Sequence, residues 1–254
     1  MGHQESYYRH NEAYAAFLAN WDERFYARYA DALKPDRAGA PVLDVGCGVG
    51  QVVKRLADAG FDAQGVEISE PGVARARQFG LNCRSYDGRR LPFPDRHFAG
   101  VGALNVLEHV DEPEAFLAEL VRVAAPGGRV VVSSPNFFRA LGWRDYHPVM
   151  RGVASKWRNL RRPLEKRRQM RTAPAEVRFD RMTPIQREPF QPDDDAIVKT
   201  NSLEIAFFLE RAGCTVEQTL CTDRYVPAVV DWALNFTPLR HLLFNAFVVA
   251  RRNK

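Results

Sequence analysis

The sequence predicts an α/β fold built on a doubly wound, mostly parallel sheet. Apolar runs at 41–45, 61–67, 81–86 and 98–104 are separated by segments whose apolar residues recur at helical spacing. Strands that alternate with helices in this way favour parallel pairing through right-handed crossovers. A length of 254 residues fits one such domain with an insertion. Ligands of such sheets bind at the carboxyl ends of the strands.

The first half of the chain contains clear helix signals. Residues 7–33 predict one or two helices, because aromatic and aliphatic residues recur there at helical spacing: Tyr14, Phe17, Leu18, Trp21, Phe25 and Tyr29. A further helix follows the first strand and ends at Gly60. Ser69 is predicted to cap the next helix, with Pro71 in its first turn.

The second half predicts two more helices and three more strands. Asp111 is expected to cap a helix, with Glu114 in capping-box position, and Pro126–Gly128 is expected to stop it. A second helix begins at Asn201 and ends at Gly213. The remaining strands are predicted at 129–133, 214–221 and 244–250. Residues 135–200 interrupt the alternation.

The composition predicts a cytoplasmic protein. It is 46% hydrophobic and 26% charged, and no apolar run approaches the ~20 residues of a membrane span. The first residues, MGHQESYYRH, lack the apolar stretch of a signal peptide. The cysteines show no CxxC pair, which disfavours a zinc site and predicts reduced thiols. They are Cys47, Cys83, Cys214 and Cys221.

Positive charge is concentrated in one segment. The net charge is +5, yet residues 151–171 alone hold nine Lys and Arg against one acid, Glu165. Apolar residues recur within it at helical spacing: Val153, Trp157, Leu160 and Leu164. This pattern predicts a basic amphipathic helix that Pro163 interrupts or restarts. The favoured interpretation is a partly buried cap helix with a solvated basic side; an anionic or carrier-linked substrate, a membrane surface and RNA are alternatives.

A glycine-rich stretch, DVGCGVG, follows the first strand. Gly46, Gly48 and Gly50 would let the backbone approach a ligand closely, and the next helix offers free N–H groups and the positive end of its dipole. Both features suit a ligand with a carboxylate or a phosphate. A dinucleotide site would need a third glycine at residue 51, which is Gln51, so the spacing disfavours NAD. A tight turn without a ligand is the alternative.

Acidic residues end the next two strands. Glu67, in GVEIS, is placed to accept hydrogen bonds from both hydroxyls of a ribose; the alternative is a solvent-facing acid. Asp87, in SYDG, is able to accept from an adenine amino group, or simply forms an Asp-Gly turn.

Together these motifs resemble class I S-adenosylmethionine-dependent methyltransferases of the ubiquinone/menaquinone-biosynthesis type (methyltransferase type 11). The resemblance covers about residues 40–136 and includes YDGRRLPFPDRHFAGVGALNVLEHVDEP and APGGRVVVSSPN. It returns more weakly at 200–221 and 243–250. It implies a Rossmann-like, seven-stranded sheet with an antiparallel seventh strand, and S-adenosyl-L-methionine as the cofactor. One departure is Phe98-Ala99, where similar proteins have Phe-Asp; weaker local hydrogen bonding is expected, without loss of the cofactor.

Carried over by position, the resemblance also implies the cofactor contacts. The methionine portion would be held by Asp44, Gly46, Gly48, Gly50 and Asn105. The adenosine portion would be held by Glu67 at the ribose and by Ile68, Asp87 and Gly88 at the adenine. In similar proteins the N-terminal segment folds over the cofactor.

Methyl transfer to a hydroxyl needs a general base or a metal to take the proton. His109, in LEHV, and His147, in RDYHPVM, are the candidate catalytic residues. The alternatives are that His109 braces its loop through a backbone hydrogen bond and that His147 is a surface residue. Some relatives bind a divalent metal through ExxEH. Here Asn105 replaces the first acid and leaves Glu108 with the two histidines, so no metal is predicted.

These observations predict one methyltransferase domain over residues 1–254, with residues 1–36 as an N-terminal helical lid and residues 136–200 as an insertion that forms the substrate cap. The acidic run Asp193–Asp195 is expected to form a turn, or to pair with the arginines of 151–171 and close the lid.

The predicted function is methyl transfer to a small-molecule or carbohydrate-type metabolite, at oxygen rather than at nitrogen or carbon. The alternatives are an RNA methyltransferase that uses residues 151–171, a non-catalytic S-adenosylmethionine-binding module and an NAD-dependent dehydrogenase. Nucleic acid is disfavoured because no RNA-binding signature accompanies the basic residues.

Overall fold

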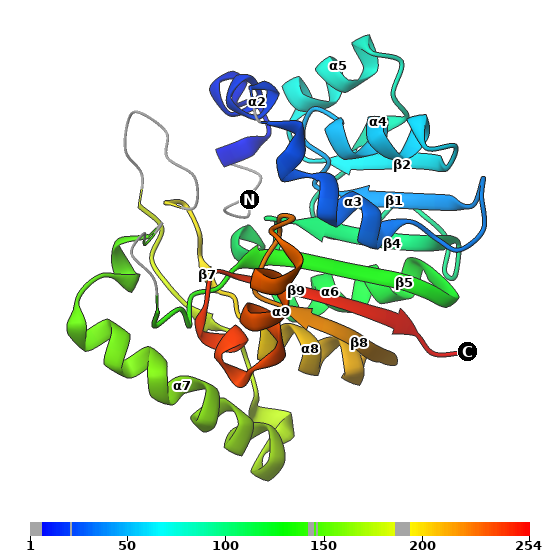
Figure 1. Ribbon diagram of the computed structural model, residues 1–254. Coiled ribbons are helices and arrows are strands. Elements are labelled where there is room, and N and C mark those ends of the chain that lie inside the picture. Colours follow the sequence, from blue (N-terminus) through cyan, green and yellow to red (C-terminus); the bar gives the residue numbers. More distant parts are fainter. Residues whose placement is uncertain (1–6, 21, 142–144, 146, 186–193) are drawn as a thin grey trace.

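The computed structural model describes residues 7–20, 22–141, 145, 147–185 and 194–254 of the chain. Its centre is a seven-stranded sheet (Figure 1). The strand order is β3 (Cys83–Ser85), β2 (Asp62–Glu67), β1 (Pro41–Val45), β4 (Phe98–Leu104), β5 (Ala124–Pro135), β9 (Asn245–Arg252) and β8 (Cys214–Leu220). Strands β1 to β5 pair in parallel, and β9 runs antiparallel to both of its neighbours. The predicted mostly parallel sheet with an antiparallel last strand is confirmed.

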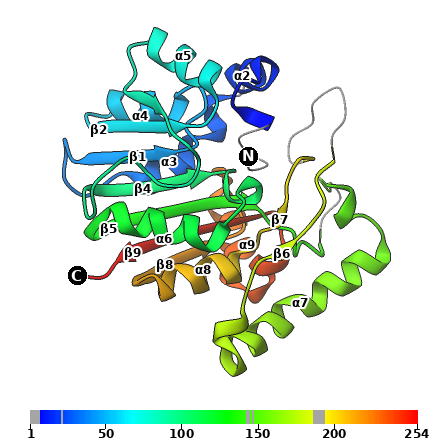
Figure 2. The same ribbon diagram turned by 180° about the vertical axis from the view of Figure 1, so that it is seen from behind.

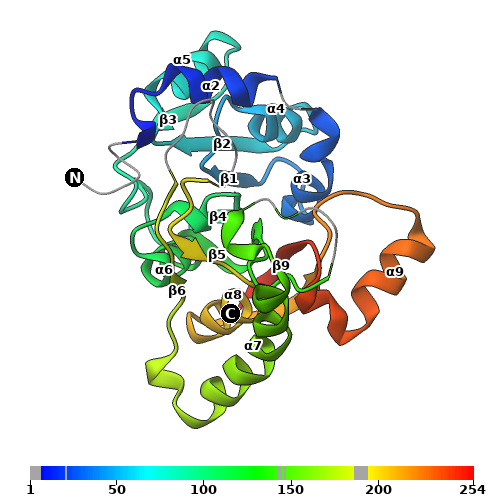
Figure 3. The ribbon, with the colours of Figure 1, turned by 90° about the vertical axis from the view of Figure 1, so that its left-hand side faces the viewer.

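Helices cover both faces of the sheet (Figure 3). One face carries α3 (Ala27–Leu33) and α4 (Gln51–Asp58), and the other carries α6 (Pro113–Val123) and α8 (Ser202–Arg211). α5 (Glu70–Gln78) packs beside β2 and β3. Each face closes its own apolar core, with Tyr29 and Val53 buried in one and Phe98 and Leu117 in the other. The strand ends therefore lie on a rigid platform.

Helix α6 begins later than the sequence predicted. Its N-cap is Glu112, whose side chain makes no capping hydrogen bond, and Asp111 lies outside the helix. The reason is Pro113, whose fixed φ and missing N–H suit the first helical position. Glu114 does not complete a capping box; its carboxylate accepts a hydrogen bond from the backbone N–H of Phe179 at 3.0 Å.

The stretch Pro126–Gly128 is not a helix stop, because α6 has already ended at Val123. It lies inside β5, where the register shifts. Ala124 pairs with Phe98, and the next β5 partner of β4 is Arg129, opposite Gly100. The residues between them bulge out of the ladder, which accommodates a proline that has no N–H to donate.

The insertion after β5 contains a long helix, α7 (Val153–Thr172), with Pro163 inside it. The prediction of an interruption at Pro163 was therefore wrong, since one helix continues through it from Val153 to Thr172. Figures 1 and 2 show α7 along the outside of the molecule. The shorter elements of the insertion are η3 (Pro148–Met150), η4 (Pro174–Glu176), β6 (Asp180–Arg181) and β7 (Val198–Lys199).

Two further regions lie beside the strand ends. The N-terminal segment forms α2 (Glu12–Ala19) and η1 (Glu23–Phe25), and Trp21 lies outside the described residues. The connection from β8 to β9 forms α9 (Ala228–Phe236) and η5 (Pro238–Leu242), which the sequence reasoning had left unassigned. Within the described residues, no helix combines the length and apolarity that crossing a membrane requires.

Candidate active site

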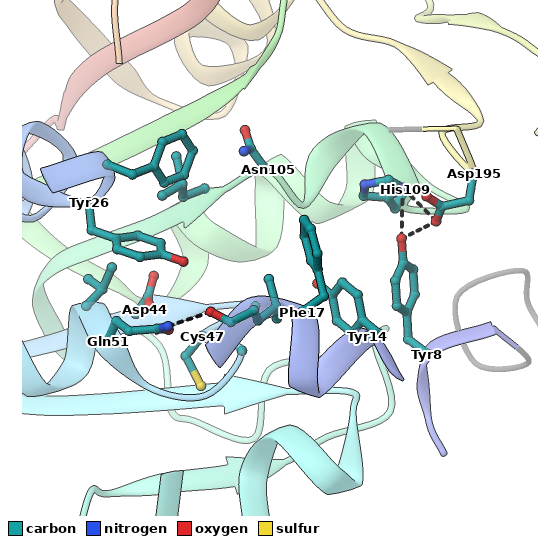
Figure 4. Close-up of a pocket in the computed structure, with 16 residues that line it drawn as sticks. Tyr8, Tyr14, Phe17, Tyr26, Asp44, Cys47, Gln51, Asn105, His109 and Asp195 are labelled. Atoms are coloured by element: carbon teal, nitrogen blue, oxygen red, sulfur yellow. Dashed lines mark hydrogen bonds and ion pairs between the residues drawn. The ribbon is translucent and has the colours of Figure 1, made fainter. Parts of the chain in front are cut away.

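A cavity of about 780 Å³ lies at the carboxyl ends of β1 and β4. The loop after β1, the N-terminal segment and the loop after β4 line it, and Asp195 from the insertion completes the wall. A second hollow of about 390 Å³ shares Tyr8, Tyr14, Gly46, Asn105 and His109 with it. That hollow reaches the end of β2, where its lining includes Glu67 and Ile68. Figure 4 shows the larger part of this site.

The glycine loop forms the floor of the cavity. Gly46, Gly48 and Gly50 have φ values of 76°, 54° and 90°, in the left-handed region that favours glycine. A Cβ atom on Gly46 would lie 2.2 Å from Cγ2 of Val106, and one on Gly48 would lie 2.8 Å from Cδ1 of Leu18. Gly46 and Gly48 line the cavity, whereas Gly50 caps α4 and shapes the loop from behind.

Asp44 lies near the end of β1, before this loop, and is buried. Its Oδ1 accepts a hydrogen bond from Tyr29 Oη at 2.8 Å. Burial raises the pKa of Asp44 to about 7; the hydrogen bond from Tyr29 opposes this shift, and the nearby Glu67 adds to it. The carboxyl group is thus close to its titration point at neutral pH, and a bound cation would favour its ionised form.

Glu67 is also buried, so the alternative of a solvent-facing acid was wrong. Its carboxylate accepts hydrogen bonds from three backbone N–H groups, those of Gly48 at 2.9 Å, Ile68 at 2.8 Å and Ser69 at 2.9 Å. Burial raises the pKa of Glu67, and these hydrogen bonds oppose the shift. The contacts hold the carboxylate between the glycine loop and the start of α5.

Asp87 and Gly88 are not among the lining residues of either hollow. The exposed Asp87 carboxylate accepts hydrogen bonds from the N–H groups of Arg89 at 2.8 Å and Arg90 at 3.1 Å, as in a simple turn. Burial raises the pKa of Asp87, but these bonds outweigh it and the net shift is downward. The residue of this segment that lines the site is Tyr86, which the sequence reasoning missed.

His109 and Asn105 lie on the loop that follows β4. Asn105 adopts a φ of 52°, which is unusual for a non-glycine residue, and lines both hollows. Nδ1 of His109 lies 3.2 Å from Tyr8 Oη and 3.2 Å from Asp195 Oδ2. Tyr8 also donates a hydrogen bond to Asp195 (Figure 4). These two partners of the imidazole ring are side chains from the N-terminal segment and the insertion.

The protonation of His109 follows from its partner. Asp195 is buried, and although burial raises its pKa, the charge of His109 and the hydrogen bonds from His109 and Tyr8 make the net shift downward. An ionised carboxylate only accepts hydrogen bonds, so Nδ1 of His109 carries the proton. Nε2 lies 3.8 Å from Glu108 Oε1, and in the neutral ring with its proton on Nδ1 it holds the lone pair.

The structure does not bring His147 to this cavity. Its side chain is buried rather than on the surface, and Nδ1 accepts a hydrogen bond from the N–H of Val149 at 3.1 Å, which caps η3. Burial lowers the pKa of His147. Among the residues that the structure describes, no three His, Cys, Asp or Glu side chains gather as metal ligands.

The acidic run forms the predicted turn at Asp194 and Asp195, while Asp193 lies outside the described residues. Asp195 contacts His109 and Tyr8, whereas Arg162 and Lys166 of the basic helix both pair with Asp180. No sequence motif marked Asp195 or Tyr8 as site residues, because their contacts join segments far apart in the chain.

The charge and shape of the lining define the ligand class. The carboxyl groups of Asp44, Glu67 and Asp195 face the two hollows, and no Lys or Arg is among the described lining residues. Aromatic rings complete the wall: Tyr8, Tyr14, Phe17, Phe25, Tyr26 and Tyr86. Carboxylates and aromatic faces suit a cation.

The chain is similar to known methyltransferases. Residues 43–132 match the family described as "Methyltransferase domain". A 2-methyl-6-phytyl-1,4-hydroquinone methyltransferase of Synechocystis sp. is 37% identical over 140 residues, which cover 50% of this chain and 42% of that protein. A demethylmenaquinone methyltransferase of Renibacterium salmoninarum is 38% identical over 104 residues, covering 39% of this chain and 44% of that protein. The chain thus spans less than half the length of these curated relatives.

A solved S-adenosylmethionine-dependent methyltransferase from Mesorhizobium loti superposes with a TM-score of 0.58 at 16% identity. The superposition covers 90% of this chain and 98% of the other, which shows a common fold. Fold and site together define a doubly wound α/β domain whose hollows at the strand ends are lined by carboxyl groups and aromatic rings. Residues 43–132 thus match a methyltransferase domain, and this similarity, together with the common fold, supports S-adenosyl-L-methionine as the cofactor.

Proposed function

We propose that the protein transfers a methyl group from S-adenosylmethionine to the oxygen of a small-molecule or carbohydrate-type metabolite. The observation that carries this proposal is a cavity with carboxyl groups and aromatic rings at the strand ends, and with no Lys or Arg among its described lining residues. That lining matches a sulfonium with an ammonium group. The hydroquinone and demethylmenaquinone methyltransferases among the relatives support a small cyclic acceptor.

In this proposal the glycine loop and Asp44 bind the methionine portion, because they form the floor of the larger hollow. Asn105 faces the same portion from the β4 side. Glu67 and Ile68 lie at the second hollow, where the ribose and adenine would bind, and Tyr86 offers the adenine an aromatic face. When bound, the cofactor supplies a methyl group already activated on a sulfonium, so the protein's main task is alignment.

His109 is the proposed general base. Its Nε2 would take the proton of the acceptor hydroxyl, while Asp195 holds Nδ1–H and stabilises the imidazolium that forms. Residues 1–36 are proposed to act as a lid and residues 136–200 as a substrate cap. The contact between Tyr8 and Asp195 joins these two segments over the cavity and would exclude water. His147 is left with a structural role in the insertion.

The test is a thermal unfolding experiment with S-adenosylhomocysteine, NAD or no ligand. A ligand at about 100 times its Kd stabilises by about 2.7 kcal/mol, which raises the midpoint by several degrees. We expect a shift with S-adenosylhomocysteine and none with NAD. Hydroquinones, catechols and sugars would then be offered with methyl-labelled cofactor. Label transfer to a hydroxyl supports the proposal, and a protein that binds cofactor without any transfer would point to a binding module.

A further inference from the structure

Helix α7 packs against the protein with its polar side and exposes its apolar side, the reverse of an ordinary surface helix. Its buried residues are Asn159, Pro163 and Lys166. Its apolar residues face solvent, with exposed fractions of 75%, 63%, 38% and 70% for Val153, Trp157, Leu160 and Leu164. A helix that packs on a core normally buries its apolar stripe. The sequence predicted this stripe as the buried side of a cap helix, and that interpretation was wrong.

Specific polar contacts fix the orientation of α7. Nδ2 of Asn159 donates to the carbonyl oxygens of Phe137 and Arg139, both at 3.0 Å. Nζ of Lys166 lies 2.6 Å from Oε1 of Glu204, a fully buried carboxylate on α8. Turning the apolar stripe inward would break these buried contacts and would bury other polar groups without partners. The outward direction of the stripe is therefore built into the packing.

Cations flank the stripe on both sides. At about 100° per residue, the four apolar side chains fall within about 60° of the helix circumference. Arg161 and Arg168 lie on one side of them and Arg167 on the other, each about 50–70° from the centre of the stripe. Arg162 and Lys166 pair with Asp180 on the inner side of the helix, so the positive charge beside the stripe comes from Arg161, Arg167 and Arg168.

We propose that α7 docks the protein on an anionic lipid surface. The helix would lie flat in the interface, with the apolar stripe at the boundary of the acyl chains and the flanking arginines on lipid phosphates. Its position along the outside of the molecule leaves this face accessible (Figures 1 and 2). The proposal does not depend on the methyl acceptor, and it does not require a membrane-spanning segment.

Charge distinguishes the lipid surface from other occupants. A second copy of the chain would bring an equally positive helix against the first, and like charges would repel. RNA would pair with the arginines but leave Trp157 and Leu164 in water. An anionic bilayer accepts both the cations and the apolar stripe.

The test is co-sedimentation of the purified chain with vesicles. We expect binding to phosphatidylcholine vesicles that contain roughly one third phosphatidylglycerol, little binding to phosphatidylcholine alone, and loss of binding near 0.5 M salt. Brominated acyl chains should quench tryptophan emission in the wild type, and Trp157→Phe should abolish that quenching. Quenching that persists in this variant would place another tryptophan at the lipid and contradict the proposal.

Two variants separate the stripe from the charges. Val153→Ser/Leu164→Ser and Arg161→Glu/Arg168→Glu are each expected to reduce vesicle binding at least tenfold. The matched controls are Phe79→Ser, which removes a 75% exposed aromatic ring next to α5, and Arg37→Glu/Lys254→Glu, which reverses two exposed charges elsewhere. Both controls should bind as the wild type does.

All variants are first checked for an unchanged circular dichroism spectrum and an unchanged thermal shift with S-adenosylhomocysteine, which separates this test from that of the proposed function. Binding of both α7 variants at the wild-type level would overturn the proposal. Salt-sensitive binding to RNA without binding to anionic vesicles would overturn it in favour of nucleic acid. Dimerisation that Val153→Ser/Leu164→Ser abolishes, without vesicle binding, would identify a second copy as the occupant.

Discussion

Nδ1 of His109 lies 3.2 Å from Oδ2 of Asp195, although one residue follows β4 and the other belongs to the insertion. Tyr8, from the N-terminal segment, contacts both of them. The N-terminal segment, the loop after β4 and the insertion thus meet at the imidazole ring of His109 on the cavity wall. Because Asp195 sets which nitrogen of His109 carries the proton, the insertion contributes directly to the chemistry proposed for the loop after β4.

The substitution Asp195→Asn tests this relationship. The neutral amide no longer stabilises a protonated imidazole, and its N–H₂ group can favour the wrong tautomer of His109. We expect kcat to fall by about 10²–10³-fold while the Kd of S-adenosylhomocysteine changes little. Asp194→Asn is the matched control, since Asp194 is not a lining residue of the cavity. A kcat for Asp195→Asn within threefold of the wild type would refute the role given to Asp195.

Cofactor binding is expected to depend on pH through Asp44. Burial raises its pKa to about 7, so the side chain is mostly protonated at pH 6 and mostly ionised at pH 7.5. A cationic ligand prefers the ionised form, so the Kd of S-adenosylmethionine should fall as pH rises. For a single group with this pKa, the ionised fraction grows roughly eightfold between the two values, and Kd should fall by the same factor.

Isothermal titration calorimetry at pH 6, 6.5, 7 and 7.5 measures this dependence. Asp44→Asn keeps the shape of the side chain and removes its titration, so its Kd should be weaker at pH 7.5 and nearly flat across the range. If the variant retained the full pH dependence of the wild type, the titrating group would lie elsewhere in the cavity.

The glycine loop allows a test with a matched pair of alanine substitutions. Gly46 and Gly60 both have left-handed backbones, with φ values of 76° and 85°. A Cβ on Gly46 would lie 2.2 Å from Val106 Cγ2, whereas one on Gly60 would meet nothing within 4 Å. Gly60→Ala should therefore show only the backbone strain, about 1–2 kcal/mol, with an unchanged cofactor Kd.

For Gly46→Ala we expect a larger drop in Tm and at least tenfold weaker binding of S-adenosylhomocysteine, because Val106 must move at the edge of the second hollow. Differential scanning calorimetry and calorimetric titration give both quantities. Equal effects of the two substitutions would mean that the loop tolerates the extra methyl group and that only φ matters.

Much of the site was predictable because strand ends fix where residues lie. Gly46 and Asn105 follow strands of the same parallel sheet and Glu67 ends another, so the alternation of strands and helices alone brings them to one edge. Asp87 also follows a strand, yet its carboxylate is occupied by the N–H groups of its own turn. A sequence motif thus predicts that a residue lies at the edge of the sheet, and its local hydrogen bonds determine whether its side chain is available to a ligand.

The contribution of the insertion was not predictable from the sequence. Periodicity located the apolar stripe of α7, but the direction of that stripe depends on contacts such as Lys166 with Glu204, across separate helices. The same holds for Asp195, whose partners His109 and Tyr8 lie in other segments. The patterns in a single sequence reflect the spacing of neighbouring residues. Polar contacts between residues far apart in the chain produce no such pattern, so they could not be predicted.

The ion pair between Lys166 and Glu204 anchors α7, and breaking it should be costly. Glu204 is fully buried, so Lys166→Met leaves a carboxylate without its cation and should lower stability by about 3–5 kcal/mol. Burial already raises the pKa of Glu204, and removing the lysine should raise it further. When the pKa of a carboxyl group is higher in the folded than in the unfolded protein, the folded state becomes less stable as the pH rises through the interval between these two values. The Tm deficit of the variant should therefore grow from pH 5.5 to pH 8.

Thermal unfolding of two further variants completes the test. Lys166→Met/Glu204→Gln removes the buried charge and should recover most of the lost stability with little pH dependence. Lys54→Met breaks the ion pair between Lys54 and Asp58, whose side chains are 57% and 63% exposed, respectively. Because this pair is exposed, the substitution should change Tm by at most about 2 °C. A similarly small change for Lys166→Met would show that Glu204 reaches water or a proton without its partner. The orientation of α7 would then depend mainly on the hydrogen bonds of Asn159 to the chain after β5.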